Sequence, residues 1–418
     1  MAEPSHRVAL VDAEGRPLRA PVDVPLPWPS ARDLRDAVAA PDAVEVVPPW
    51  QADGVVTHLL STSARDGAGS PWPVASDALG RRAAGGDGWP AWYLPGWRHQ
   101  VDAWVSAVLA ERGLTPTGPA EIVRWWSLSA VLRFPVSASD GAARDVWFKA
   151  TCEGFHDEAA ITAALAGVAD APIPAVLGVD TGRAWLVLAD VPGAGEDASL
   201  DVALAAATAM ARLQIRLIPQ ARTLPIPVRD ADATIAALRA VVHGSVETPV
   251  MPPELVSGAR LAEPRLAAMV RALDGVGIPS TLVHGDLHTG NVAGTPAHPL
   301  IFDWTDACLA HPYLDGRLLA NSVVARREPG ADPAALERAV RDAFTGPWRA
   351  AYPDLDHDLA WELSRDAEHV FEMISYEGIV RAQAPGSRWE LGGVITEKLA
   401  RLVDRGGSEA AAVVAPPA

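Results

Sequence analysis

The spacing of apolar residues changes once along this 418-residue chain, at Pro192-Gly193. From about residue 118 to this point, short apolar runs and one amphipathic segment predict three strands, a helix and two further strands. Beyond it, helical periods dominate as far as residue 403. The sequence therefore predicts an α+β fold in which a small antiparallel-sheet lobe precedes a large helical lobe, with a cleft between the two.

The predicted elements cover most of the chain. Strands are expected at 122–126, 131–136, 146–149, 176–179 and 185–188, and helices at 97–112, 156–165, 200–217, 231–242, 255–273, 333–344, 359–380 and 391–403. Within the helical part, residues 281–303 break the helical period. This stretch contains two short apolar runs, 281–283 and 300–302, and polar residues follow each run directly.

The first 95 residues form a region of their own. Short apolar runs such as 8–11, 44–47 and 55–60 alternate with Pro- and Gly-rich turns, which predicts a small, mainly β region. Residues 67–92 are rich in Gly, Pro and Trp and have no helical period, so we expect a long irregular connection there. The chain is thus predicted to contain three regions, 1–95, 96–193 and 194–418.

The composition argues against several classes of protein. A formal net charge of −17 disfavours nucleic acid as the main partner, because phosphate backbones select surfaces rich in Lys and Arg, whereas it suits a cationic ligand. The N-terminus has no basic stretch followed by an apolar one, and apolar runs elsewhere end before membrane-spanning length. Two cysteines cannot form a disulfide framework. We therefore expect a cytoplasmic protein that binds neither membrane nor nucleic acid.

Lysine is rare in this chain, since only Lys149 and Lys398 stand among 35 basic residues. Arginine carries a wide planar fork, whereas lysine carries a compact point charge, so a site that needs one ammonium group in a tight space cannot exchange them freely. Lys149 ends a predicted strand and is interpreted as a functional residue. Lys398 lies on an ordinary terminal amphipathic helix and is interpreted as retained by chance.

Three residues of the stretch 281–303 suit phosphoryl transfer, which needs metal-bound phosphates and a carboxylate near the attacking hydroxyl group. Asp286 follows a short predicted strand, and Asn291 comes five residues later, so one compact loop can hold a base and a metal ligand. Asp303 comes twelve residues after Asn291. Two short strands that bracket a turn would bring Asn291 and Asp303 together around Mg²⁺, which prefers oxygen ligands.

These residues belong to two motifs that carry a family resemblance. The run His284-Gly-Asp-Leu-His-Thr-Gly-Asn-Val292, together with Leu300-Ile-Phe-Asp-Trp304, resembles the paired signature of aminoglycoside phosphotransferases, choline kinases and related sugar kinases. The resemblance covers roughly residues 120–400 and implies a bilobal protein-kinase-like fold. It also implies that the chain is an enzyme, a phosphotransferase with an alcohol group as acceptor.

The resemblance gives the motif residues their roles. Asp286 would orient the substrate hydroxyl group and accept its proton. Asn291 and Asp303 would bind Mg²⁺, and His284 would mainly hold the catalytic loop. By the same resemblance, residues 1–95 would be an N-terminal cap, 96–193 the small nucleotide-binding lobe and 194–418 the helical catalytic and substrate lobe.

The family also expects a lysine on the third strand of the small lobe and a glutamate on the next helix. Lys149 would contact the α- and β-phosphates of the nucleotide, and Glu158 would hold its ammonium group in place. Glu153 and Asp157 are alternatives for this carboxylate, and a solvent-facing helix acid is the plainer interpretation of Glu158.

The remaining nucleotide contacts are expected from a turn and a hinge. No Gly-x-Gly-x-x-Gly precedes the lysine, and the turn 126–130 takes its place. Ser127 and Ser129 are weak candidates for a phosphate contact there, because serines in a turn often only form the turn. The backbone of Ala189 and Val191, in the hinge, would meet the purine of ATP or GTP.

Acidic residues after the second motif are candidates for the substrate side. Glu368 and Glu372 are four residues apart and share a helix face, and Asp306 comes soon after the metal ligand. Such carboxylates would receive ammonium groups of a substrate, although a solvated helix face is the plainer alternative. Asp315 is expected to cap or hold a helix.

The combined prediction is a kinase that transfers the γ-phosphate of ATP or GTP to a hydroxyl group of an aminoglycoside, an amino sugar or a related amine-bearing alcohol. A sugar kinase or a choline-like metabolic kinase is the alternative within the enzyme class. A catalytically silent nucleotide-binding protein is the alternative outside it.

Overall fold

The computed structural model of the chain describes residues 5–12, 16–26, 31–40, 43–45, 48–52, 55–61, 89–155, 157–194 and 196–404. Residue contacts divide the chain into two compact units. The first comprises Met1–His156, Leu177–Asp190 and Ala382–Glu390, and the second comprises Asp157–Val176, Val191–Arg381 and Leu391–Ala418. Most of the predicted connection at 67–92 lies outside the described residues, and the division into three regions stays a prediction.

The N-terminal part of the first unit is a small sheet in the order β2-β1-β5-β3, with β4 also paired to β5. Its elements are β1 (Ser5–Val11), β2 (Val22–Val24), α1 (Ala31–Ala37), β3 (Val44–Glu45), β4 (Trp50–Ala52) and β5 (Val55–Ser61). β1 runs parallel to β5, with His6 opposite Val56. The buried side chains Val8, Leu10 and Leu60 pack with Leu34 of α1. The mainly β character of this region agrees with the prediction.

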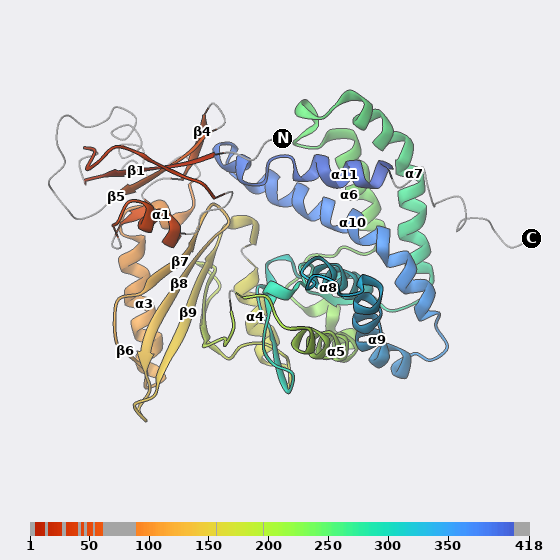
Figure 1. The fold of residues 1–418 in the computed structure, drawn as a ribbon. Coiled ribbons are helices and arrows are strands. Elements are labelled where there is room, and N and C mark those ends of the chain that lie inside the picture. The colour runs from red at the N-terminus through yellow and green to blue at the C-terminus, as the bar shows by residue number, and fades with distance from the viewer. Residues whose placement is uncertain are drawn as a thin grey trace, which may run out of the picture. The chain divides into compact units, whose positions relative to one another are not determined.

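A second, six-stranded sheet follows in the order β10-β11-β9-β8-β6, with β7 paired to β8. Its strands are β6 (Thr115–Pro116), β7 (Glu121–Trp125), β8 (Ser129–Ser137), β9 (Ala143–Thr151), β10 (Val176–Asp180) and β11 (Trp185–Ala189). The pairs of β9 with β8 and with β11 are antiparallel. Helix α3 (Trp97–Glu111) lies beside this sheet (Figure 1) and packs on it through Trp97, whose ring lies 5.9 Å from that of Phe148. Short 3-10 helices of this unit are η1 (Ala91–Tyr93), η2 (Glu153–Phe155) and η7 (Pro385–Leu391).

The second unit is mainly helical. Its helices are α4 (Glu158–Ala166), α5 (Leu200–Leu217), α6 (Ala231–Gly244), α7 (Pro253–Gly275), α8 (Tyr313–Ala325), α9 (Pro333–Ala351), α10 (His357–Ala382) and α11 (Val394–Asp404), with short 3-10 helices η3 (Ile218–Thr223), η4 (Thr248–Val250), η5 (Thr289–Asn291) and η6 (Trp304–Asp306). Two small antiparallel ladders interrupt the helices, β12 (Thr281–Val283) with β15 (Cys308–Ala310) and β13 (Val292–Thr295) with β14 (His298–Ile301).

Helix α5 is rich in apolar residues. The segment Leu200–Thr223 is long and apolar enough to cross a membrane by length and composition, with a mean hydropathy of 1.2. The apolar character of this helix is explained by its place in the core of the second unit, where Ala203, Ala206 and Met210 are fully buried.

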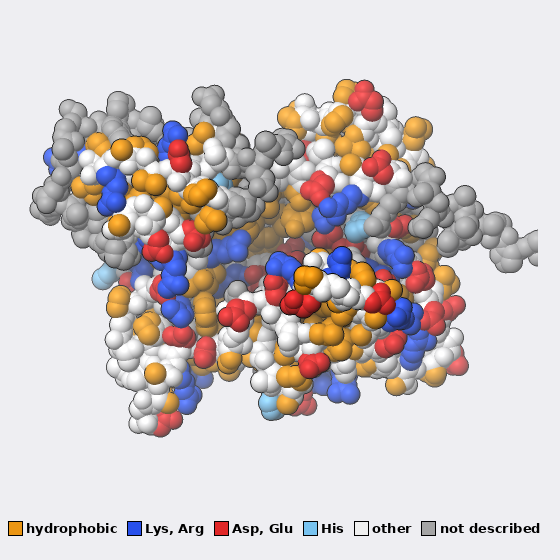
Figure 2. Space-filling view, in the orientation of Figure 1, with side chains coloured by type: hydrophobic (Ala, Val, Ile, Leu, Met, Phe, Trp, Pro, Cys, Tyr) orange, Lys and Arg blue, Asp and Glu red, His pale blue; other side chains and the backbone are white. Residues whose placement is uncertain are grey.

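On the face drawn in Figure 2, acidic and basic side chains are interspersed over the described surface.

Helix α8 and the strands β13 and β15 were not predicted. Residues 313–320 of α8 are all buried, so the helix has no polar face and its sequence shows no amphipathic period. Gly316 within it lies so close to the ring of Phe344 that a side chain would overlap it. The helix is therefore defined by its packing partners rather than by its own pattern.

Candidate active site

The first motif forms a loop between β12 and β13. Strand β12 ends at Val283, and the loop places Asp286 and Asn291 in direct contact. The side-chain nitrogen Nδ2 of Asn291 donates hydrogen bonds to the backbone oxygen of Asp286 (2.9 Å) and to its carboxylate Oδ2 (3.2 Å). One compact loop therefore holds the predicted base and the predicted metal ligand together.

The hairpin β13–β14 brings the second motif to the first. Asn291 immediately precedes β13, and Asp303 follows β14 by two residues. The N–H of Phe302 donates to the backbone oxygen of Asn291 at 3.1 Å. Asp303 itself has φ +67°, in the left-handed region that non-glycine residues seldom adopt and that is enriched at functional sites.

His284 and Asp315 hold this loop from the buried side. The Asp315 carboxylate is fully buried and accepts hydrogen bonds from the backbone N–H groups of His284 (2.8 Å) and Gly285 (3.0 Å) and from Nε2 of Gln214 (2.9 Å). Burial raises the pKa of Asp315 to about 7 against the effect of these donors. Of its predicted roles, that of a helix cap is wrong, since Asp315 lies within the first turn of α8 and holds the loop of the first motif.

His284 connects the two motifs. Its Nε2 lies 3.0 Å from the carbonyl oxygen of Phe302, and its Nδ1 accepts from the N–H of Asp286 at 3.3 Å. The ring is fully buried, and burial lowers its pKa. A neutral imidazole that donates through Nε2 satisfies both contacts.

Further contacts fix the two ends of the loop. Thr289 donates through Oγ1 to Asp197 at 2.7 Å, and its N–H donates to Ser322 of α8 at 3.0 Å. His288 lies with Nε2 3.5 Å from Asp286 Oδ2. Burial alone would lower the pKa of His288, but the Asp286 carboxylate raises it on balance.

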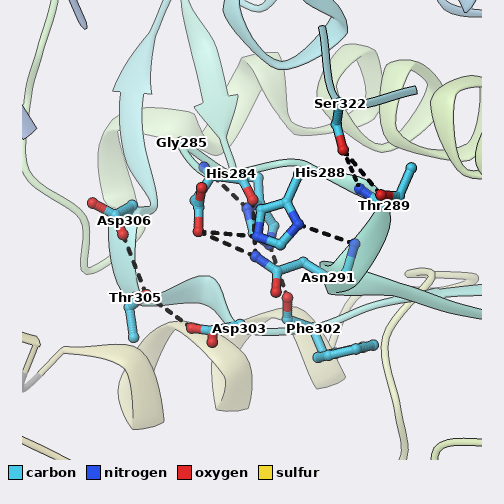
Figure 3. Close-up of polar contacts among 12 residues, drawn as sticks. His284, Gly285, His288, Thr289, Asn291, Phe302, Asp303, Thr305, Asp306 and Ser322 are labelled. Carbon is cyan, nitrogen blue, oxygen red and sulfur yellow. Dashed lines mark hydrogen bonds and ion pairs between the residues drawn. The ribbon is translucent and has the colours of Figure 1, made fainter. Parts of the chain in front are cut away.

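Asp303, Thr305 and Asp306 lie in a row, as Figure 3 shows. The hydroxyl of Thr305 is 2.8 Å from Asp303 Oδ1 and 3.3 Å from Asp306 Oδ2. Burial, followed by the charge of Asp286, raises the pKa of Asp306 to about 7. The loop passes close behind it, because Gly285 has φ +84° and a Cβ there would overlap the backbone oxygen of Asp306.

The oxygen atoms of this hairpin fit a magnesium ion. The amide nitrogen of Asn291 faces Asp286, so its oxygen Oδ1 points away from that residue. Asp303 adds a carboxylate at the same open end of the hairpin, where Val292 pairs with Ile301. Amide and carboxylate oxygens are the ligands that Mg²⁺ takes in phosphate-binding sites, where it retains several waters.

The predicted nucleotide residues lie on the elements expected of them. Lys149 is on β9, paired across the sheet with Val131 and Leu186. Glu158 is the first residue of α4 in the second unit, with 3% of its surface exposed. Ala189 ends β11, and Val191 is buried just after it.

The two serines of the turn after β7 already form hydrogen bonds within the protein. Ser127 donates to the buried carboxylate of Glu390 through its hydroxyl and through its N–H (3.3 Å), and it accepts from Nε2 of Gln383 at 2.7 Å. Ser129 accepts from the indole nitrogen of Trp126 at 2.8 Å. The contact between Ser127 and Glu390 joins residues 263 positions apart, and no sequence signal pointed to it.

The predicted substrate carboxylates of α10 already contact other side chains of the protein. Glu368 is 1% exposed, and its Oε2 lies 2.7 Å from Nδ1 of His369. Glu372 forms an ion pair with Lys398 of α11. Burial alone would raise the pKa of Glu372, but His369 and Lys398 lower it on balance. Lys398 thus has a defined partner, which its interpretation as a chance retention missed.

Tyr376 lies on the same helix, one turn beyond Glu372. Burial raises its pKa, and the charges of Asp286, Glu372 and Asp306 add to this effect. Arg229, which the sequence did not single out, contacts this helix through Ser375 and lowers the pKa of Asp306.

A family model described as "Phosphotransferase enzyme family" matches residues 122–353, more than half of the chain. A search of the curated proteins found no match.

Three solved structures illustrate the structural similarity. A choline/ethanolamine kinase family protein from Mesorhizobium loti is 16% identical, with a TM-score of 0.50, over 75% of this chain and 95% of that one. The macrolide 2'-phosphotransferase MphH from Brachybacterium faecium is 18% identical, with a TM-score of 0.49, over 73% and 98%. An aminoglycoside phosphotransferase, APH(3'')-Id from Streptomyces rimosus in complex with ADP and streptomycin, is 21% identical, with a TM-score of 0.37, over 64% and 98%. The first of these identifies the fold as protein-kinase-like, and the predicted α+β fold class is confirmed.

Proposed function

Because the chain belongs to the phosphotransferase enzyme family, we propose that it is a small-molecule kinase that transfers the γ-phosphate of ATP or GTP to a hydroxyl group. The acceptor is an aminoglycoside, an amino sugar or a related amine-bearing alcohol. The observation that carries this proposal is the contact of Asp286 with Asn291 on one loop, joined by a hairpin to Asp303. We also propose that the enzyme works in the cytoplasm.

In this proposal Asp286 is the catalytic base. Its carboxylate orients the acceptor hydroxyl group and takes its proton as the oxygen bonds to the γ-phosphorus and the bond to the leaving nucleoside diphosphate breaks. The hydrogen bond from Asn291 and the nearby ring of His288 limit the rotation of this carboxylate. Orientation of this kind lowers the barrier because the reacting groups meet already aligned.

Asn291 and Asp303 would hold Mg²⁺ through their side-chain oxygens. When bound, the ion neutralises charge that develops on the phosphate oxygens. The left-handed backbone of Asp303 and the hydrogen bond from Thr305 fix the direction of its carboxylate without any ion. In this proposal the carboxylate of Asp303 is aligned before the ion binds.

On the nucleotide side, Lys149 would contact the α- and β-phosphates, with Glu158 as the carboxylate that holds it. The backbone of Ala189 and Val191 would meet the purine. Ser129 and Ser127 belong to the turn proposed to cover the phosphates. Because both the hydroxyl and the N–H of Ser127 donate to Glu390, a phosphate contact through either group would compete with this carboxylate.

On the acceptor side, Asp306, Glu368 and Glu372 are the proposed binding residues. Asp306 is the carboxylate with the best support, since the hydroxyl of Thr305 contacts both it and Asp303 and the charge of Asp286 raises its pKa. A substrate ammonium group near it would lower its pKa again and gain a charge-assisted hydrogen bond. At Glu372 the substrate would compete with Lys398, so a contact there is proposed only for a substrate that displaces this lysine.

A screen of acceptors tests the proposed function. Aminoglycosides, amino sugars and simple amino alcohols are incubated with ATP or GTP and Mg²⁺, and release of nucleoside diphosphate is measured. Turnover that depends on one amine-bearing alcohol supports the proposal. Turnover only on neutral sugars or on choline would favour the metabolic alternative, and the absence of turnover with retained nucleotide binding would favour the silent one.

A further inference from the structure

The first unit contains a cavity of about 210 Å³ that the proposed phosphoryl transfer does not use. Strands β1, β3, β5 and β7, helix α1 and the C-terminal segment η7 line it, and all of its lining residues belong to this one unit. Its volume is below the roughly 300–1,000 Å³ of pockets for drug-sized ligands, so it suits a smaller molecule.

Buried polar groups form a chain along one wall of the cavity. The hydroxyl of Tyr93 donates to Oε2 of Glu45 at 3.3 Å, and Oε1 of Glu45 lies 2.7 Å from Nδ1 of His58. Nε2 of His58 in turn lies 2.9 Å from Nδ1 of His6. His6, Glu45 and His58 all line the cavity, and each is at least nine-tenths buried. Placing a carboxylate and two imidazoles inside so small a sheet costs stability, and such clusters concentrate at functional sites.

Aromatic side chains and a second carboxylate also line the cavity. Trp126 and Trp389 line the cavity, and the ring of Trp389 lies 6.1 Å from that of His6. Glu390 is 3% exposed and also lines the cavity. The cavity is therefore bounded by two buried carboxylates and by indole faces.

The two arginines that line the cavity contact other groups of the protein. Arg35 donates to the carbonyl oxygen of Ile122 at 3.2 Å. The guanidinium carbon of Arg124 lies 4.2 Å from the centre of the Trp126 ring. The carboxylates of Glu45 and Glu390 also have protein partners, but each carboxylate oxygen can accept a further hydrogen bond. Such acceptors, together with aromatic side chains, favour a donor that carries positive charge.

We propose that this cavity binds a small organic cation, an amine of about the size of a monosaccharide, between the carboxylates of Glu45 and Glu390 and the indole of Trp389. The ammonium group meets the acceptors, and the apolar part of the ligand lies against the aromatic wall. Glu390 also connects the cavity to the turn after β7, because its carboxylate accepts from the N–H and hydroxyl of Ser127. An amine bound at Glu390 therefore changes the hydrogen bonding of Ser127, in the turn proposed to cover the nucleotide phosphates. Only this consequence, and not binding of the amine itself, rests on the proposed function.

Hydrogen–deuterium exchange of the whole protein, with 2-amino-2-deoxyglucose as the probe and glucose as its neutral analogue, tests the site directly. We expect the amine to slow exchange in residues 55–61 and 121–126, and to do so at a concentration at least tenfold lower than glucose. Protection confined to residues 284–306 and 368–376 would place the amine at the acceptor site and overturn the proposal. Equal effects of the two sugars would overturn the cationic class of ligand.

Two variants separate loss of the site from loss of the fold. Glu45→Gln removes one carboxylate charge, and Val123→Phe fills the cavity from a position that is 38% exposed and leaves every polar group in place. Both are expected to weaken the protection at least tenfold while the thermal transition of Val123→Phe stays that of the wild type. Unchanged protection in Val123→Phe would refute the cavity as the site, whatever the kinase activity of the protein.

Discussion

Replacement of Asp315 by alanine is expected to displace the catalytic loop without removing any group that would meet a substrate. The buried carboxylate accepts hydrogen bonds from His284, Gly285 and Gln214. Each buried donor left without a partner costs about 1–3 kcal/mol. Water entering the space left by the side chain would satisfy some of these donors, so we expect the second unit to lose about 3–6 kcal/mol of stability.

The same change is expected to slow the reaction. Two of the lost hydrogen bonds hold the backbone directly before Asp286, and a displacement of about 1 Å at a reacting group costs on the order of 100-fold in rate. Calorimetry should show the thermal transition of Asp315→Ala lowered by roughly 10 °C, at about 2–4 °C per kcal/mol for a unit of this size. Nucleoside diphosphate release measures kcat on the same samples.

Asp332→Ala is the matched control. Asp332 also accepts a backbone hydrogen bond, from Ala334 at 3.0 Å, but it is exposed at the start of α9. Loss of such a cap costs about 1 kcal/mol, and kcat should not change. If Asp315→Ala and Asp332→Ala had the same transition temperature and the same kcat, Asp315 would not hold the loop in the way described here.

Three further predictions address other parts of the site. Gly285→Ala should lower kcat at least 100-fold, because the new Cβ would overlap the backbone oxygen of Asp306 at a positive φ, and wild-type kinetics would contradict this close approach. Lys149→Arg should raise the nucleotide KM at least tenfold with an unchanged thermal transition, and an unchanged KM would remove the special role of this lysine. Burial raises the pKa of Glu390 to about 7, above the value of about 4.3 expected in the unfolded chain, so its proton stabilises the fold at low pH and this contribution is lost as the pH rises through 7. The thermal transition of Glu390→Gln should therefore fall less than that of the wild type between pH 5 and pH 8, and parallel pH profiles would contradict the assignment.

The sequence predicted those elements whose pattern reflects one buried face. Helix α5 spans Leu200–Leu217, as expected from its apolar period, and β9 contains the predicted run 146–149. Helix α8 was missed because residues 313–320 are all buried, so its polar residues Asp315 and Arg317 do not mark a solvent-facing side. Strands β13 and β15 are too short to carry an alternating pattern of their own.

The motif residues could likewise be identified from the sequence, whereas the residues that hold them in place could not. Asp286, Asn291 and Asp303 stand in two short motifs, and local turn geometry brings them together. The contacts of Asp315 with the loop and of Glu390 with Ser127 join residues that are 31 and 263 positions apart in the chain. Such contacts depend on tertiary packing, for which a single sequence contains no local signal.

The central claim is that Asp286 is the base of a phosphoryl transfer, and Asp286→Asn tests it most directly. Asparagine keeps the size of the side chain but cannot take the proton of the acceptor. With the best acceptor from the screen, transfer in a single turnover is expected to fall by about 10²–10⁴-fold, while calorimetric titration shows nucleotide affinity within about twofold of the wild type. Transfer at the wild-type rate by Asp286→Asn would contradict the claim.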